Sequence, residues 1–163
     1  MKKYFNLLFV LCALCLCTIS CNNKQKVEVE DDGITEFARN LSTQDIIDVQ
    51  NLVKKFLDAA VEARFEDAAA MLYAPDSANV WEEPLPLDND QLHAEANRLA
   101  MLPPQSYTID YINFNTAVDN DVKVTLVVRE GDPENNIEPV KVNIHLNPMN
   151  YLGGWRLCMA KKD

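Results

Sequence analysis

The sequence predicts an α+β fold in which N-terminal helices pack on a four-stranded antiparallel sheet. Apolar residues recur at three- and four-residue steps before Pro104 and at two-residue steps after it, which are the periods of helices and strands. Short, turn-like connections join the segments with the two-residue period, so consecutive strands should pair antiparallel. From Ser42 onward the chain has roughly 120 residues, the size of one domain.

Residues 1–20 have the features of a secretory signal peptide. Lys2 and Lys3 precede an almost wholly apolar run over residues 4–19, which is shorter than the roughly 20 residues of a membrane-spanning helix. At its end Thr18-Ile19-Ser20-Cys21 resembles the bacterial lipobox, in which a small residue precedes a cysteine that is acylated. We therefore expect Cys21 to carry the lipid and to begin the mature protein.

Two residues beside Cys21 bear on whether the protein is lipidated and on which membrane holds it. Thr18 stands where the commonest lipobox has Leu, so an ordinary signal peptide cut nearby, or an uncleaved anchor, is the alternative. The resemblance to Gram-negative lipoproteins implies transport to the outer membrane, because Asn22 and not Asp follows the cysteine. The expected location is the cell envelope, with the protein facing the periplasm or the exterior. Residues 21–41 are polar and acidic, which is typical of a flexible tether.

The cysteine content indicates how the fold is stabilised, and the net charge limits the kinds of partner. Removal of the signal peptide and lipidation of Cys21 leave Cys158 as the remaining free thiol, so an apolar core and not a disulfide framework must hold the fold. The chain has 15 basic and 25 acidic side chains. Without Lys2 and Lys3 the mature net charge is about −12, which argues against binding to nucleic acid.

Three helices are predicted before the strands. Ser42 and Asp45 form a capping box, and an apolar stripe follows at helical spacing. The stripe consists of Ile46, Val49, Val53, Phe56, Leu57 and Ala60. A second helix is expected over Phe65–Tyr73, and a third over Asp88–Met101, where Asp88 and Gln91 form another capping box. The intervening residues 76–87 are predicted to be irregular, with Trp81 either closing over a ligand or attaching this loop to the core.

Four strands are predicted after the helices, each paired with the next one along the chain. The first is Tyr107–Thr116, and the turns between the others are residues 119–121, 131–133 and 147–154. In the last three strands one parity is apolar and the other polar, so one sheet face should cover the core. The inner positions are Val122, Val124, Leu126, Val128, Val140, Val142, Ile144, Leu146, Trp155, Leu157 and Met159.

The run VQNLVKKFLDAAVEARFEDAAAMLYAPD resembles the opening of the NTF2-like branch of the cystatin-like α+β fold, and LGGWRLCM resembles its closing strand. The likeness covers most of residues 42–160, although Glu62-Ala63-Arg64 lacks the glycine-aspartate often found between the first two helices. It implies a curved sheet that forms a cone with the helices, with ligands inside. The family includes isomerases, dehydratases and binding proteins, so the fold does not choose among activities.

The leading hypothesis is a lipid-anchored, non-catalytic module that binds an apolar small molecule or a partner protein. Its ligand site would combine inner sheet positions with two aromatic residues expected on the helices, of which Tyr73 offers a hydroxyl. These residues are Phe56, Tyr73, Val124, Leu126, Val142, Ile144 and Trp155. The alternative is that the same side chains fill one another's space as a packed core.

The rival hypothesis is an isomerase- or dehydratase-like enzyme. Asp110 would be its general base if it faced the cone, with Tyr107 or Tyr111 nearby. A bulge in this strand would instead leave Asp110 in water. His145 has the parity of the outer face, and a Cys158–His145 nucleophilic pair would need a slip in strand register.

Other partners are weaker expectations. No cofactor or metal is predicted, because His93 and His145 lie far apart and no phosphate-binding motif occurs. The acidic residues Glu82, Glu83, Asp88 and Asp90 fit a solvated loop better than a calcium site. A further structural alternative is a homodimer formed through the outer sheet face. The positive side chains expected on that face are Lys123, Arg129, Lys141 and Arg156.

Overall fold

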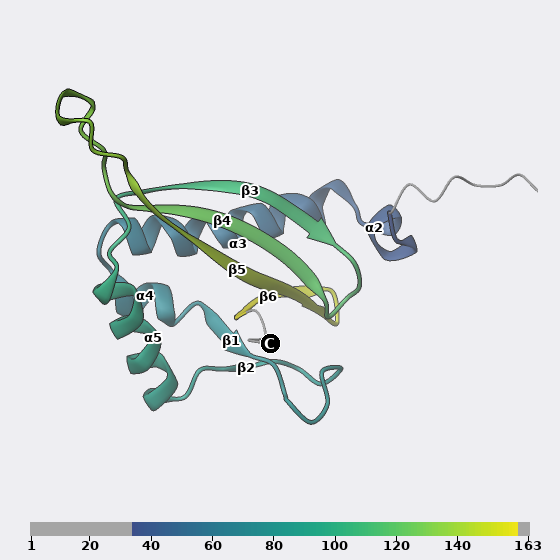
Figure 1. The fold of residues 1–163 in the computed structure, drawn as a ribbon. Coiled ribbons are helices and arrows are strands. Elements are labelled where there is room, and N and C mark those ends of the chain that lie inside the picture. Colours follow the sequence, from purple (N-terminus) through teal and green to yellow (C-terminus); the bar gives the residue numbers. More distant parts are fainter. Residues whose placement is uncertain (1–33, 160–163) are drawn as a thin grey trace, which may run out of the picture. The chain divides into compact units, whose positions relative to one another are not determined.

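The computed structural model describes residues 34–159, which have an α+β fold (Figure 1). The helices are α2 (Glu36–Asn40), α3 (Thr43–Val61), α4 (Phe65–Ala69) and α5 (Asn89–Met101). The strands are β1 (Leu72–Ala74), β2 (Leu85–Pro86), β3 (Ser106–Phe114), β4 (Asn120–Arg129), β5 (Val140–Tyr151) and β6 (Gly154–Met159), and a 3₁₀ turn covers Pro133–Asn135. The predicted lipidation site at Cys21 lies outside the described residues.

The sheet is larger than the sequence predicts. It has six strands in the order β2-β1-β6-β5-β4-β3 and is open, with β2 and β3 at its edges. The four predicted strands are antiparallel neighbours within it. The prediction of a four-stranded antiparallel sheet is nevertheless wrong, because β1 pairs parallel with β6 and antiparallel with β2. The resulting sheet is mixed.

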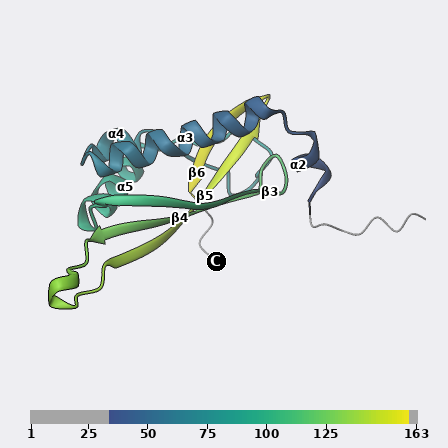
Figure 2. The ribbon, with the colours of Figure 1, turned by 90° about the horizontal axis from the view of Figure 1, so that it is seen from above.

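Helix α3 begins where the capping box predicts. The side chain of Ser42 accepts from the backbone amide of Asp45 at 3.2 Å, and Asp45 Oδ2 accepts from the amide of Ser42 at 3.0 Å. These contacts satisfy amides that have no partner within the helix. The helix then crosses one face of the sheet (Figure 2) and buries Val49, Val53 and Phe56 completely.

The break between α3 and α4 forms without a glycine. Ala63 has φ +58°, a left-handed conformation that costs a residue with a side chain more than it costs glycine. The amide of Arg64 donates to the carbonyl of Ala59 at 2.9 Å, and the amide of Ala63 donates to that of Ala60 at 3.1 Å. This pair of bonds is the Schellman arrangement that ends many helices.

The predicted second helix is wrong beyond its first half. Helix α4 ends at Ala69, and Leu72–Ala74 form strand β1 instead. Leu72 pairs with Leu157, and Tyr73 pairs with Cys158 on β6. The loop predicted over residues 76–87 also contains strand β2, which pairs with β1. These short strands are held by partners distant in sequence, which local periodicity does not reveal.

The hydrophobic core lies between α3 and the inner face of the sheet. Its fully or nearly buried members come from both layers and from β1 and α5. They include Val49, Val53, Phe56, Leu57, Leu72, Leu99, Val122, Val124, Leu126, Leu146 and Leu157. Burial of these side chains is the main favourable term for the fold, since no disulfide occurs among the described residues.

The last hairpin is tighter than predicted. Strand β5 continues through Pro148 to Tyr151, which pairs with Gly154 on β6. Only Leu152 and Gly153 form the turn, at φ +49° and +79°. In this register Arg156 pairs with Met149 and Cys158 pairs with Asn147, while His145 pairs with Lys123 on β4.

Candidate functional site

The residues predicted to form a ligand site divide into a buried group and a partly exposed group. Phe56 and Val124 are 0% exposed and Leu126 is 5% exposed, and all three belong to one core cluster. Ile144 and Trp155 are partly buried against the same cluster. The buried three fill one another's space, because fully buried side chains in contact leave no volume for a ligand between them.

Tyr73 lies apart from the other predicted site residues. Its strand partner is Cys158, whereas its neighbour Leu72 pairs with the core residue Leu157. Successive residues of a strand point to opposite faces, so Tyr73 faces away from the core. Its ring instead lies 5.6 Å from the guanidinium carbon of Arg156, a cation–π contact.

Asp110 lies on the outer face of the sheet, as the bulge alternative predicts. The β3–β4 register shifts between Ile109 and Tyr111, which leaves Asp110 without a strand partner. Its Oδ2 accepts from the hydroxyl of Thr125 at 2.8 Å and lies 3.8 Å from Nζ of Lys123. Both contacts lie on the outer face, so Asp110 is not placed to act on a ligand between α3 and the inner face of the sheet.

The two tyrosines of the enzyme hypothesis point to opposite faces. Tyr107 pairs with Leu126 on the inner face, and its hydroxyl donates to Asp58 at 2.7 Å. Burial and this hydrogen bond raise the pKa of Tyr107 to about 12. Tyr111 pairs with Lys123 on the outer face. The structure therefore separates Tyr107 from Asp110.

Asp121 joins two side chains on the outer face. Its Oδ2 accepts from the Tyr111 hydroxyl at 2.6 Å, and its Oδ1 lies 2.8 Å from Nδ1 of His145. Burial opposes ionisation, but these two hydrogen bonds hold the pKa of Asp121 below its usual range. The hydrogen bond to Asp121 in turn raises the pKa of Tyr111. The network is exposed to solvent, so a reaction there would not be protected from water.

Cys158 is not placed for nucleophilic chemistry. It is 0% exposed, and burial raises the pKa of its thiol to about 12 although Arg156 opposes the shift. Its partner across β5 is Asn147 and not His145. A nucleophilic cysteine needs an accessible thiolate and a base beside it. Cys158 has neither an accessible thiol nor His145 as its strand partner.

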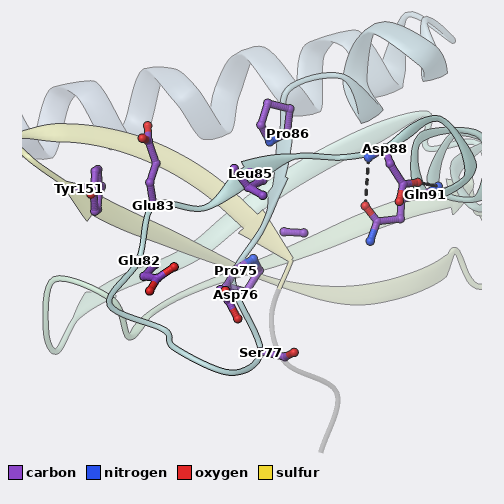
Figure 3. Close-up of a pocket in the computed structure, with 11 residues that line it drawn as sticks. Pro75, Asp76, Ser77, Glu82, Glu83, Leu85, Pro86, Asp88, Gln91 and Tyr151 are labelled. Carbon is purple, nitrogen blue, oxygen red and sulfur yellow. Dashed lines mark hydrogen bonds between the residues drawn. The ribbon is translucent and has the colours of Figure 1, made fainter.

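An open cavity of about 670 Å³ lies where the β1–β2 loop meets β5 and the start of α5 (Figure 3). Its size is within the usual range for small-molecule sites. Four carboxylates line it together with apolar and aromatic side chains. The lining residues are Ala74, Pro75, Asp76, Ser77, Glu82, Glu83, Leu85, Pro86, Asp88, Gln91 and Tyr151.

The loop that forms one wall of this cavity is ordered by its own polar side chains. Asp76 Oδ1 accepts from the amides of Ala78 and Asn79 at 2.6 and 3.2 Å. Asn79 in turn accepts from the amide of Trp81 at 3.2 Å and donates to Glu82 at 3.1 Å. Asp and Asn side chains commonly stabilise turns through such bonds, so Glu82 is held at the cavity by local contacts.

Arg156 connects the same wall to the sheet. Its Nη2 lies 3.5 Å from Glu83 Oε1, and its guanidinium stacks on Tyr73 of β1. The side chain therefore links β6, β1 and the β1–β2 loop. Trp81 takes no part in this attachment: it is 65% exposed, so the prediction that it attaches the loop to the core is wrong.

The cavity was not predicted as a site from the sequence. From the sequence, its acidic residues are expected to form a solvated loop, and Tyr151 lies within the turn expected over residues 147–154. The signal that could have located it is Pro84-Leu85-Pro86, because prolines flanking one apolar residue favour an extended segment at a sheet edge. That segment is β2, which borders the cavity with Leu85 and Pro86.

A second groove of about 710 Å³ runs between α3 and the edge strand β3. It is lined by Ile46, Gln50, Asn51, Lys54, Ile109, Tyr111, Ile112 and Phe114. None of the seven predicted ligand-site residues borders it. The groove lacks the converging charged groups of the first cavity, because Lys54 is its one charged lining residue.

The chain matches no protein-family model, no curated protein and no solved structure. Over residues 34–159 no helix has the length and apolar character to span a membrane. In the same region no three His, Cys, Asp or Glu side chains come together in a way that suits a metal ion. The geometry of the sites is therefore the basis on which a function can be assigned.

Proposed function

We propose that this chain is a lipid-anchored binding module of the bacterial cell envelope and not an enzyme. The lipobox-like Thr18-Ile19-Ser20-Cys21 supports attachment to the outer membrane through Cys21. Helices followed by a sheet whose four longest strands are antiparallel neighbours support an NTF2-like domain. The binding role rests mainly on one observation, the cavity of about 670 Å³ under the β1–β2 loop.

The lining of this cavity indicates the chemistry of its ligand. Asp76, Glu82 and Glu83 bring negative charge to it, while Leu85 and Tyr151 offer apolar and aromatic surface. A ligand with a positive group and an apolar body satisfies both kinds of lining. The proposed ligand is therefore a cationic amphiphilic molecule, or a basic and apolar segment of a partner protein, and not a purely apolar compound.

Binding is favoured over catalysis by the places of the candidate catalytic groups. Asp110 is hydrogen-bonded to Thr125 on the outer face, and Tyr107 contacts Asp58 on the inner face. Cys158 is completely buried. These groups do not converge on one cavity, and a catalytic site needs its acid, base and reacting atoms within a few ångströms of one another.

The dimer alternative receives less support from the outer face. Lys123 lies near Asp110, and Arg156 is drawn toward Glu83 and Tyr73 at the cavity. The four positive side chains expected to gather on one face are thus partly neutralised and partly directed elsewhere. We do not propose a dimer on this basis.

Titration with dodecyltrimethylammonium tests the proposed ligand chemistry, with dodecyl maltoside as the uncharged comparison. Binding to the mature protein, followed by calorimetry below micelle-forming concentrations, should be stronger for the cation and should weaken several-fold in Glu82→Gln. Asp90→Asn is the matched control, because Asp90 is an exposed carboxylate on α5 that does not line the cavity. Equal binding by both variants would contradict the proposed site.

Attachment to the membrane is tested separately by intact-mass analysis of the membrane fraction from a Gram-negative host. The expected mass is that of a chain beginning at an acylated Cys21. An unmodified N-terminus at another residue would contradict the anchor and leave the ligand proposal to its own test.

A further inference from the structure

The tip of the last hairpin carries a leucine that the turn does not require. Leu152 is 91% exposed and occupies the first position of a two-residue turn at φ +49°. Turns of this kind favour Asn, Asp or Gly there, because a left-handed conformation is unfavourable for a bulky side chain. Neither turn geometry nor core packing accounts for an apolar side chain at this place.

This hairpin tip lies at the end of the domain where the chain enters from residue 33. Figures 1 and 2 show α2, the start of α3 and the β5–β6 hairpin at one end, with α4 and α5 at the other. The hydroxyl of Thr35 donates to the carbonyl of Phe114 at 3.4 Å. The rings of Phe37 and Phe114 both lie edge-on to Trp155 near the base of the hairpin, at 6.4 and 5.7 Å.

Further apolar surface is exposed at the same end. Ile34 is 51% exposed, and Ile46 and Ile47 near the start of α3 are 38% and 41% exposed. Single exposed apolar residues are ordinary on a protein surface. Four of them at the end that follows the expected anchor at Cys21 are informative, because an anchor there would hold this end near a membrane.

We propose that this end, with Leu152 at its tip, contacts the surface of the bilayer that holds the anchor. The inference rests on the proposed acylation of Cys21. Residues 22–33 separate Cys21 from Ile34, and a chain of that length spans at most about 47 Å when fully extended. The anchor therefore keeps the hairpin within reach of the lipid surface at all times.

The anchor also explains why a small apolar contact is sufficient. One leucine inserted at the boundary of headgroups and acyl chains binds weakly by itself. Attachment through Cys21 makes the second contact intramolecular and raises its effective concentration. Glu36, Asp45 and Asp48 lie at this end as well, so the contact depends on apolar insertion and not on attraction to anionic lipid.

The test uses the full mature protein, purified from membranes and reconstituted into vesicles of phosphatidylcholine and phosphatidylethanolamine. Leu152→Cys is labelled with an environment-sensitive fluorophore, since native Cys158 is completely buried. Met101→Cys is the matched control, because Met101 is 79% exposed and is the last residue of α5, a helix at the other end of the domain from α2 (Figure 1). Flotation of the vesicles reports anchoring independently of the fluorophore.

The expected result is a blue-shifted emission at position 152 that brominated lipids quench, with little change at position 101. Raising the fraction of phosphatidylglycerol should not strengthen the quenching. Leu152→Asn should fold with an unchanged or higher Tm, since asparagine suits the turn. In that background a fluorophore at Ile47→Cys should be quenched less than in the parent.

Two results overturn the proposal, and they differ from each other. If the protein floats with the vesicles but position 152 remains as exposed to water as position 101, the contact is wrong and the anchor stands. If the protein does not float, the anchor itself is wrong, and the membrane contact is lost with it.

Discussion

The hydroxyl of Tyr107 donates to the carboxylate of Asp58 at 2.7 Å and so joins edge strand β3 to the second half of α3. The two residues are separated by 49 positions in the chain. This bond fixes how the helix lies over the sheet on the side away from the β5–β6 hairpin. It also keeps the tyrosine protonated, because burial and the neighbouring carboxylate raise the pKa of Tyr107 to about 12.

Tyr107→Phe should lower the free energy of unfolding by about 1 kcal/mol at pH 7, the usual net value of one hydrogen bond. A pKa that is higher in the folded state gives stability that is present below the ordinary value near 10 and is lost as pH rises toward 12. Urea unfolding at pH 7, 10 and 11 should therefore show that the free energy of unfolding falls less with rising pH in the variant than in the parent.

Tyr111→Phe is the control for this measurement, because the Tyr111 hydroxyl bonds to Asp121 on the exposed face. It should change stability at pH 7 less than Tyr107→Phe does. Equal effects of the two variants would argue that the Tyr107–Asp58 bond has no special role in holding α3.

The two capping boxes show which parts of the fold local sequence can predict. Ser42 with Asp45, and Asp88 with Gln91, start α3 and α5 as the sequence indicates. Each box involves residues three positions apart, so its chemistry is complete within one short segment. The alternation of Val122, Val124 and Leu126 likewise predicts which face of β4 is buried.

The parts that could not be predicted depend on partners distant in sequence. Strand β1 has only three residues, and an alanine-rich helix precedes it, so Leu72 and Tyr73 continue a helical pattern when taken alone. Their strand character comes from pairing with Leu157 and Cys158. The cavity was missed for the same reason, since it forms only when the loop after β1 folds back beside β5.

Ala63→Gly should stabilise the protein by about 0.5–1 kcal/mol. Ala63 is held at φ +58° by the Schellman bonds that end α3, and glycine adopts this conformation without the cost of a side chain. Thermal unfolding should show a higher Tm. Ala60→Gly, three residues earlier inside the helix, is the matched control and should lower stability.

Cys158 should be unreactive in the folded protein. Burial raises the pKa of its thiol to about 12, and both exclusion of reagent and the low thiolate fraction slow its modification. With a disulfide reagent at pH 8, the native protein should react only as fast as it unfolds, and urea should release the thiol. Cys158→Ser is the control, because it should lose the thiol reaction that urea releases. Rapid reaction of the folded parent protein would contradict the burial of Cys158.

Asp110→Asn should change stability by less than about 1 kcal/mol and leave ligand binding unaffected. The carboxylate is partly exposed and lies 3.8 Å from Lys123, and such surface ion pairs contribute little. Urea unfolding and the dodecyltrimethylammonium titration measure the two expectations. A several-fold loss of binding would return Asp110 to the site and revive the enzyme hypothesis.

The last prediction concerns whether the interior between α3 and the sheet is filled. Val124→Trp should destabilise the protein by about 1–3 kcal/mol or prevent folding, because Val124 is 0% exposed and an added indole has no room. Thr125→Trp is the control, since the next residue of β4 points to the outer face and should tolerate the change. Urea unfolding of both variants makes the comparison. An unchanged Tm for Val124→Trp would mean that the interior can open, and a small molecule inside the cone would again be the better explanation of Phe56, Leu126 and Ile144.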